Sequence, residues 1–278
     1  MNNAQNLSTM AQYENFKLKH PEKTILVNGI EWKYIIGGLA GKVILLLPGG
    51  PRRPGMRFQF LMELEEKYTV ISPSYPLICR MKSLIDGIIA VLDNESVNNV
   101  NVFGASFGGL VAQFLLKESP DKISKVILSN TGTAVKDSKI PKRLKRFRRV
   151  IQFTPDKVVR TIAKRLFLKG IDFSEEIKPF YEQFLYQAFS KDVVLCHYDC
   201  LVDFHTHFSI DSSILEHHSN QVLIINAEDD TFVGKDTSAA LQSVFPGAKF
   251  HNFECGGHIL SLTKHDEYFQ LIINFLNQ

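Results

Sequence analysis

The sequence predicts an α/β fold in which a mostly parallel, doubly wound sheet is interrupted by a large helical insertion. Two observations predict the sheet: apolar runs of strand length recur along the chain, and segments with helical spacing of apolar residues stand between them. A third predicts the insertion, because this alternation stops near residue 131 and resumes near residue 220. We therefore expect a core from residues 1–130 and 221–278, with a helical cap from residues 131–220.

The first half of the chain supplies most of the predicted core. Two strands form a predicted hairpin, since Asn28-Gly29 between them is a favoured two-residue turn. Further apolar strands are typical of a sheet that is covered on both faces. Helical spacing predicts one helix before the strand at 100–103 and another after it. The strands are expected at 24–27, 30–36, 43–47, 68–72, 100–103 and 125–130, and the helices at 83–94 and 110–116.

The second half begins with helical spacing and ends with two more strands. One short apolar run, at 192–195, is a weak strand candidate inside the predicted cap. After the cap, the return of strands completes the sheet, and a helix closes the chain. The helices are expected at 143–153, 157–168, 177–189 and 266–276, and the strands at 221–226 and 249–253.

Composition places the chain among ordinary globular proteins. Its 278 residues are 45% hydrophobic and 22% charged, which suits one large domain with a sizeable core. Residues 1–24 are polar and do not resemble a signal peptide, and no run reaches the roughly 18 apolar residues of a membrane span. We therefore expect a soluble, cytoplasmic protein without a transmembrane segment. Its four cysteines are then expected to be free thiols.

Positive charge is concentrated in the predicted cap. Residues 136–169 hold thirteen Lys or Arg and two Asp, whereas the rest of the chain holds 19 basic and 27 acidic residues. Such a run is typical of a solvated helical surface, and it also suits recruitment of an anionic substrate or docking on an acidic protein or membrane. Nucleic-acid binding is disfavoured, because no recognisable module or interleaving of aromatic residues accompanies the charge.

The chemistry is concentrated in the run Gly104-Ala105-Ser106-Phe107-Gly108, which stands between a predicted strand and a predicted helix. A sharp turn there exposes Ser106 at the end of the strand, and the two glycines allow strand and helix to approach closely. The helix N-terminus behind Ser106 offers free N–H groups to a developing negative charge. This context predicts a serine nucleophile.

Two further residue types follow in a characteristic order. Asp229 and Asp230 come after the strand at 221–226, and His258 comes after the strand at 249–253. The order Ser106, Asp230, His258 and the Gly-x-Ser-x-Gly run resemble the α/β-hydrolase superfamily over roughly residues 24–276. The resemblance implies the α/β-hydrolase fold, with Ser106 as nucleophile, His258 as general base and Asp230 orienting the imidazole. The family pattern Gly-x-x-Asp favours Asp230 over Asp229, although Ala227 stands where glycine is usual.

The oxyanion hole is expected after the strand at 43–47. The family commonly has His-Gly-Gly there, and this chain has Pro48-Gly49-Gly50. The donors of an oxyanion hole are backbone N–H groups, so the replacement of the histidine does not by itself abolish the hole. By register, the amides of Gly50 and Phe107 are the expected pair.

These residues predict a serine hydrolase that cleaves an ester, thioester or amide of a small molecule through an acyl-enzyme on Ser106. The carboxylesterases and thioesterases (EC 3.1) are the expected class, and no metal or organic cofactor is implied. Cys196-His197-x-x-Cys200 matches no standard zinc pattern. Acyl transfer or lactone chemistry would use the same triad. The substrate and the oligomeric state are not determined by the sequence.

One alternative belongs to a different class of function. Residues 103–113 are also similar to the elbow of maspardin, a member of the superfamily that is regarded mainly as a binding protein. The chain would then be a catalytically weak or inactive binding protein that has kept the hydrolase fold. The replacement of the oxyanion histidine by Pro48 is compatible with this alternative.

Overall fold

A computed structural model describes residues 8–278 except 40, 136–138, 170, 172 and 234. Eight strands form one sheet in the order β1-β2-β4-β3-β5-β6-β7-β8. β1 pairs antiparallel with β2 and β2 antiparallel with β4, and the remaining pairs are parallel. The strands are β1 (Lys23–Val27), β2 (Ile30–Gly37), β3 (Val43–Leu47), β4 (Thr69–Ser74), β5 (Val100–Ala105), β6 (Ile123–Ser129), β7 (Val222–Ala227) and β8 (Lys249–Phe253).

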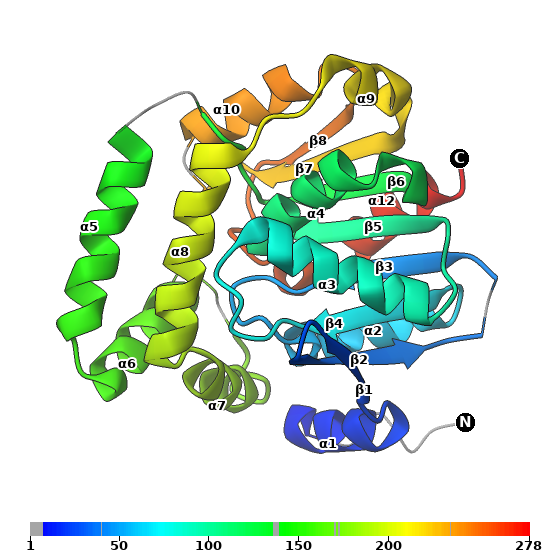
Figure 1. Cartoon of the computed structure of the whole chain (residues 1–278). Coiled ribbons are helices and arrows are strands. Elements are labelled where there is room, and N and C mark those ends of the chain that lie inside the picture. Colours follow the sequence, from blue (N-terminus) through cyan, green and yellow to red (C-terminus); the bar gives the residue numbers. More distant parts are fainter. Residues whose placement is uncertain (1–7, 40, 136–138, 170, 172, 234) are drawn as a thin grey trace.

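Helices cover both faces of the sheet, as a doubly wound fold requires (Figure 1). The α-helices are α1 (Thr9–Lys19), α2 (Phe58–Glu65), α3 (Met81–Asn94), α4 (Phe107–Glu118), α5 (Lys139–Phe153), α6 (Asp156–Phe167), α7 (Lys178–Ala188), α8 (Lys191–His207), α9 (Ser212–His217), α10 (Lys235–Val244), α11 (Leu260–Thr263) and α12 (His265–Leu276). The 3-10 helices are η1 (Pro54–Arg57), η2 (Pro120–Lys122) and η3 (Ser219–Gln221).

The all-apolar strand β3 shows why its sequence does not alternate. Side chains of a strand point to opposite faces in turn. Leu45 and Leu47 pack in the cluster formed with α3 and α4, whereas Ile44 and Leu46 pack in the cluster formed with α2 and α12. Both faces of β3 are therefore buried, and the prediction of a central strand is confirmed.

The hairpin between β1 and β2 is also confirmed. Asn28 and Gly29 have φ values of 50° and 78°, the left-handed pair that a type I′ turn requires. Residues 192–195, the weak strand candidate, lie instead in α8, so that expectation was wrong. The helix is favoured over a strand because Ser190 caps its N-terminus, where the serine hydroxyl accepts a hydrogen bond from the Val193 N–H at 3.3 Å.

Between β6 and β7 the described residues form five α-helices, α5 to α9, and no strand. Figure 1 shows α5 to α8 beside the end of the sheet at which β5 ends and α4 begins. Helices near the carboxyl ends of the parallel strands can contribute side chains to a site there. None of the described helices is long and apolar enough to cross a lipid bilayer.

Several helices were not expected from the sequence, among them α1, α2, α8 and α10. α1 contributes Phe16 to the core, where its ring lies 5.6 Å from that of Phe58 in α2, centroid to centroid. His20 after α1 lies 2.6 Å from the Glu65 carboxylate at the end of α2. α1 has a weak apolar pattern and α2 is short, so contacts of this kind stabilise them.

Substitution of Gly87 in α3 tests how tightly this core is packed. A Cβ at Gly87 would overlap the indole ring of Trp32, which is fully buried. Gly87→Ala should therefore lower the free energy of unfolding by about 2 kcal/mol, despite the better helix propensity of alanine. Chemical denaturation of this variant beside Gly41→Ala, where a Cβ meets nothing, measures the difference. Equal stability of the two variants would contradict the packing.

Candidate active site

Ser106 stands at the turn from β5 into α4 with a backbone that non-glycine residues rarely adopt. Its φ is 54° and its ψ is −124°. Such strain persists only where neighbouring structure holds it. The Ser106 N–H donates to the Ser129 carbonyl at 2.9 Å, and the Thr131 hydroxyl donates to the Ser106 carbonyl at 2.8 Å. Hydrogen bonds from β6 and the loop after it therefore hold the serine in place.

Two glycines make this turn sterically feasible. A Cβ at Gly104 would overlap the Gly108 carbonyl, and one at Gly108 would come within 2.5 Å of the Leu47 carbonyl oxygen. The turn is thus pressed against the end of β3, where Pro48 follows. This is the close approach of strand and helix that the Gly-x-Ser-x-Gly run predicts.

His258 joins Ser106 to Asp230. Its Nε2 lies 2.8 Å from Ser106 Oγ, and its Nδ1 lies 2.8 Å from Asp230 Oδ2. A carboxylate only accepts hydrogen bonds, so Nδ1 donates to Asp230 and Nε2 is left to accept from the serine hydroxyl. The side chains of His258 and Asp230 are only 5% and 4% exposed, which keeps this chain of hydrogen bonds out of water.

The two neighbouring aspartates have different partners. The second oxygen of Asp230 accepts from the Phe232 N–H at 2.7 Å, so the carboxylate is held in orientation. Asp229 points elsewhere and accepts from the N–H groups of Gly256 and Gly257 at 3.2 and 2.8 Å. Asp230 therefore contacts the imidazole, and Asp229 fixes the glycine turn that precedes it.

Asn130 supports the same loop and was not foreseen. It follows β6 with φ 40°, a conformation that asparagine tolerates better than most residues. Its side-chain amide donates to the Gly257 carbonyl at 2.9 Å and accepts from the Ala227 N–H at 2.8 Å. Asn130 thus ties the loop that carries His258 to the strand that precedes Asp230. Its position directly after an apolar strand is the one signal the sequence offers.

The predicted oxyanion residues flank the serine from two elements. Phe107 is the first residue of α4, so its N–H is not used by the helical ladder. Gly50 lines the same pocket as Ser106, and a Cβ there would lie 3.6 Å from the Phe189 ring. The turn around Gly50 is closed by the Arg52 N–H, which donates to the Gly49 carbonyl at 3.0 Å.

Aromatic rings from the helical insertion and from the loop after β7 enclose the histidine. The rings of Phe167 at the end of α6 and of Phe232 lie 6.1 and 4.7 Å from the His258 ring, centroid to centroid. His197 of α8 packs on Phe107 at 4.8 Å. Phe167 and Phe232 reduce the access of water to the imidazole, and the sequence analysis did not assign either residue to the site.

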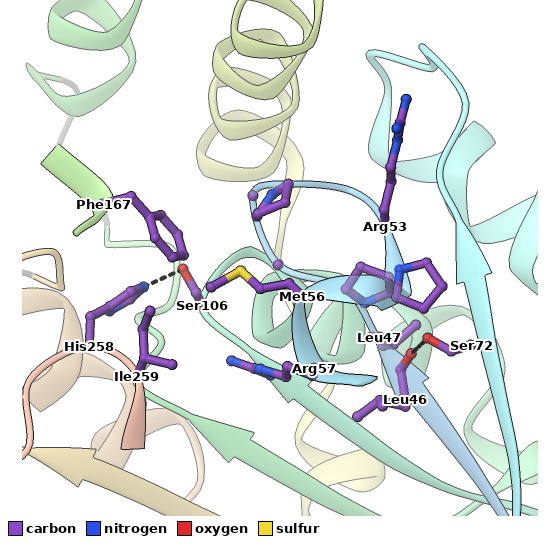
Figure 2. A pocket seen from close by; sticks show the side chains of 15 residues that line it. Leu46, Leu47, Arg53, Met56, Arg57, Ser72, Ser106, Phe167, His258 and Ile259 are labelled. Carbon is purple, nitrogen blue, oxygen red and sulfur yellow. Dashed lines mark hydrogen bonds between the residues drawn. The ribbon is translucent and has the colours of Figure 1, made fainter. Parts of the chain in front are cut away.

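Figure 2 shows the pocket that contains Ser106 and His258. Its enclosed free volume is about 20 Å³, roughly the room of one water-sized group. The lining includes two arginines and no acidic residue. The lining residues are Leu46, Leu47, Pro48, Gly49, Gly50, Pro51, Arg53, Pro54, Met56, Arg57, Ser72, Ser106, Phe167, His258 and Ile259.

The Cys196-His197-x-x-Cys200 run lies on α8 with both cysteines buried. Burial, reinforced by the nearby Arg52 cation, lowers the pKa of His197 to about 4, so the imidazole is neutral at pH 7. Across the residues that the structure describes, no group of His, Cys, Asp and Glu is arranged to hold a metal ion.

The basic segment is only partly free. Arg148 of α5 contacts Asp199 of α8 at 2.5 Å, and Arg160 of α6 contacts Asp156 and donates to the Tyr186 carbonyl. The exposed apolar residues Phe147 and Val150 lie among the remaining cations of α5. Part of the positive charge therefore holds helices of the insertion together, and the exposed cations of α5 include Lys142, Arg143, Lys145, Arg146 and Arg149.

Comparison with known proteins places this site in a family. The sequence model described as alpha/beta hydrolase fold matches residues 79–265. RutD of Caulobacter vibrioides is 23% identical over 266 residues, which cover 90% of this chain and 96% of that protein. A protein of Dechloromonas aromatica named 2-hydroxy-6-oxononadienedioate/2-hydroxy-6-oxononatrienedioate hydrolase 1 is 22% identical over 215 residues, covering 74% of this chain and 72% of its own.

Solved structures agree on the fold. A hydrolase from Pseudomonas aeruginosa superposes with a TM-score of 0.75 at 16% identity, covering 93% of this chain and 99% of its own. A bromoperoxidase from Bacillus anthracis gives 0.75 at 20% identity, covering 92% and 100%. With the family match extending from residue 79 to residue 265, the chain belongs to the α/β-hydrolase family.

Proposed function

We propose that this protein is a serine hydrolase that cleaves an ester, thioester or amide of a small molecule. The observation that carries the proposal is the hydrogen-bonded chain from Ser106 through His258 to Asp230, with 2.8 Å at each step. His258 takes the hydroxyl proton as Ser106 Oγ attacks the carbonyl carbon. The proton then passes to the leaving group, and an acyl-enzyme forms on Ser106. A water molecule activated by His258 releases the acid.

The developing oxyanion needs fixed donors. The amides of Gly50 and Phe107 are the proposed pair, and each such donor contributes on the order of 3 kcal/mol to transition-state stabilisation. Pro48 replaces the side chain of the usual histidine and leaves the backbone N–H of Gly50 available. Its own lack of an N–H removes no proposed donor.

Asp230 is proposed to stabilise the imidazolium that forms during each proton transfer. Its carboxylate is nearly buried, so its interaction with the charged ring is less screened than it would be in water. The same contact fixes the tautomer in which Nε2 faces the serine. Esters, thioesters and amides are all bonds that a triad of this kind cleaves without a cofactor.

A binding protein that has kept the fold is the second candidate. The enclosed volume of about 20 Å³ beside Ser106 favours it, because an ordinary substrate does not fit without movement of the surrounding helices. Its maspardin-like elbow, residues 103–113, stays a prediction. Reactivity of Ser106 separates the two candidates, since a binding protein has no need of an activated serine.

Labelling with a small neutral fluorophosphonate tests the nucleophile. We expect wild-type protein to label and Ser106→Ala to show no labelling while its circular dichroism and Tm stay within error. Ser129→Ala, a change of the same kind on β6, serves as a control for loss of one hydroxyl. No labelling of folded wild-type protein would favour the binding protein instead.

Neutralising the two aspartates separately tests their different partners. Asp230→Asn should lower kcat for a p-nitrophenyl ester by about 10⁴-fold, because an asparagine does not hold the productive tautomer. Asp229→Asn removes acceptors for the Gly256 and Gly257 amides and should cost less than about 30-fold. Comparable losses in the two variants, measured at equal Tm, would contradict the proposed role of Asp230.

A further inference from the structure

Arg57 is a half-buried arginine that lines the pocket of Ser106, and among the described residues its guanidinium has no hydrogen bond or ion pair. It ends η1, and its Nη1 is buried without a hydrogen bond. Its guanidinium lies 5.5 Å from the centroid of the Phe103 ring. The ionisable groups that act on it are the phenols of Tyr181 and Tyr268, and no carboxylate of the described residues is among them.

Arg52, a second arginine in the same region, has a structural role. Arg52 is 1% exposed, and its guanidinium donates to the carbonyls of Pro76 and Ile78 at 2.7 and 3.1 Å. Those bonds fix the loop after β4. Arg57 makes no such hydrogen bonds among the described residues, and its guanidinium lies instead over the face of the Phe103 ring.

A buried, unpaired cation destabilises the folded protein unless a ligand supplies the opposite charge. Burial lowers the pKa of Arg57, yet a guanidine remains protonated at pH 7. Arg57 also lines a second, open cavity, whose lining includes Glu63, Glu65 and Glu66. In the pocket of Ser106, by contrast, Arg53 also lines the wall and no acidic residue does. A carboxylate bound beside Ser106 would therefore meet positive charge only. Figure 2 shows Arg57 and Ser106 on the wall of this one pocket.

We propose that Arg57 binds a carboxylate of the substrate, so that the acyl group transferred to Ser106 carries a carboxylate at its far end. A guanidinium offers two parallel N–H donors that match a carboxylate, and one cation balances one negative charge. The substrate class is therefore the half-ester or half-thioester of a dicarboxylic acid. The surrounding side chains must move to admit it, because the enclosed free volume beside Ser106 is only about 20 Å³.

This inference rests on the proposed hydrolase function and keeps its chemistry. Ser106 Oγ bonds to the ester carbonyl carbon, and the bond to the alcohol or thiol breaks. The leaving group takes the serine proton through His258. Water then gives its hydroxide to the acyl carbon and its proton to Ser106 Oγ, which releases the free dicarboxylic acid. The distal carboxylate is unchanged throughout and stays on Arg57.

Paired esters test the selectivity. p-Nitrophenyl hydrogen glutarate and p-nitrophenyl valerate carry five-carbon acyl groups that differ by the distal carboxylate. Arg57→Gln should lower kcat/KM for the glutarate ester by about 10- to 100-fold, the effect of losing a hydrogen bond to a charged group, and change the valerate by less than about twofold. Arg57→Lys should fall between, because an ammonium lacks the planar fork. Equal effects on both esters would overturn the proposal.

A matched control removes the same charge elsewhere. Arg80 is 77% exposed at the start of α3, and Arg80→Gln should leave the ratio of the two kcat/KM values within about twofold of wild type. A ratio that falls as far in Arg80→Gln as in Arg57→Gln would assign the selectivity to overall charge and overturn the proposal.

Arg57→Met separates ligand binding from a structural role. Methionine replaces a half-buried cation whose Nη1 is unpaired by an apolar chain, so we expect an unchanged or higher Tm, by about 2–5 °C, together with loss of the glutarate preference. A lower Tm with the preference retained would show that Arg57 serves the fold and would overturn the proposal.

Binding of glutarate to the Ser106→Ala protein needs no catalysis and keeps the two proposals distinguishable. We expect glutarate to raise the Tm of Ser106→Ala and to leave that of Ser106→Ala/Arg57→Gln unchanged. If glutarate has no effect while wild-type Ser106 labels with fluorophosphonate, the carboxylate site is refuted and the hydrolase stands. If glutarate binds through Arg57 while Ser106 does not label, the hydrolase is refuted and the carboxylate site stands.

Discussion

The left-handed backbone of Ser106 is the constraint on which the rest of the site depends. With φ at 54°, the chain leaves β5 and enters α4 within one residue, which exposes the hydroxyl and frees the first N–H groups of the helix together. That geometry requires glycine at positions 104 and 108, and it requires hydrogen bonds from β6 to hold the strained residue. The sheet therefore acts as the rigid frame of a strained turn.

Asp230 and His258 are held in place by different neighbouring residues. Asp230 contacts the imidazole, whereas Asp229 and Asn130 hold the turn from which His258 projects. Asp229, Asp230 and Asn130 each follow a strand, and the carboxyl ends of these parallel strands lie side by side. Residues far apart in the chain therefore need only short loops to meet at Ser106.

The arginine side chains of this protein have two different roles. Arg52 and Arg148 are used for structure, since each has fixed acceptors in a neighbouring segment. Arg57 has none among the described residues, and it lines the pocket of Ser106. A charge shielded from water without a partner reduces stability, which is why we assign Arg57 to binding and not to folding. The exposed cations of α5 are available to attract anions from a distance; they include Lys142, Arg143, Lys145, Arg146 and Arg149.

The sequence by itself predicted the strands of the sheet, the elbow and the candidates Ser106 and His258, and it favoured Asp230 over Asp229 by the family pattern, because these depend on local periodicity and on residues adjacent in the chain. It failed at residues 192–195, where a capping serine outweighs a short apolar run. Only the tertiary structure decided which aspartate meets the histidine, that Asn130 and Phe167 support the site, and that Arg57 has no counter-ion. Those properties depend on which distant segments pack together, and sequence spacing does not encode that packing.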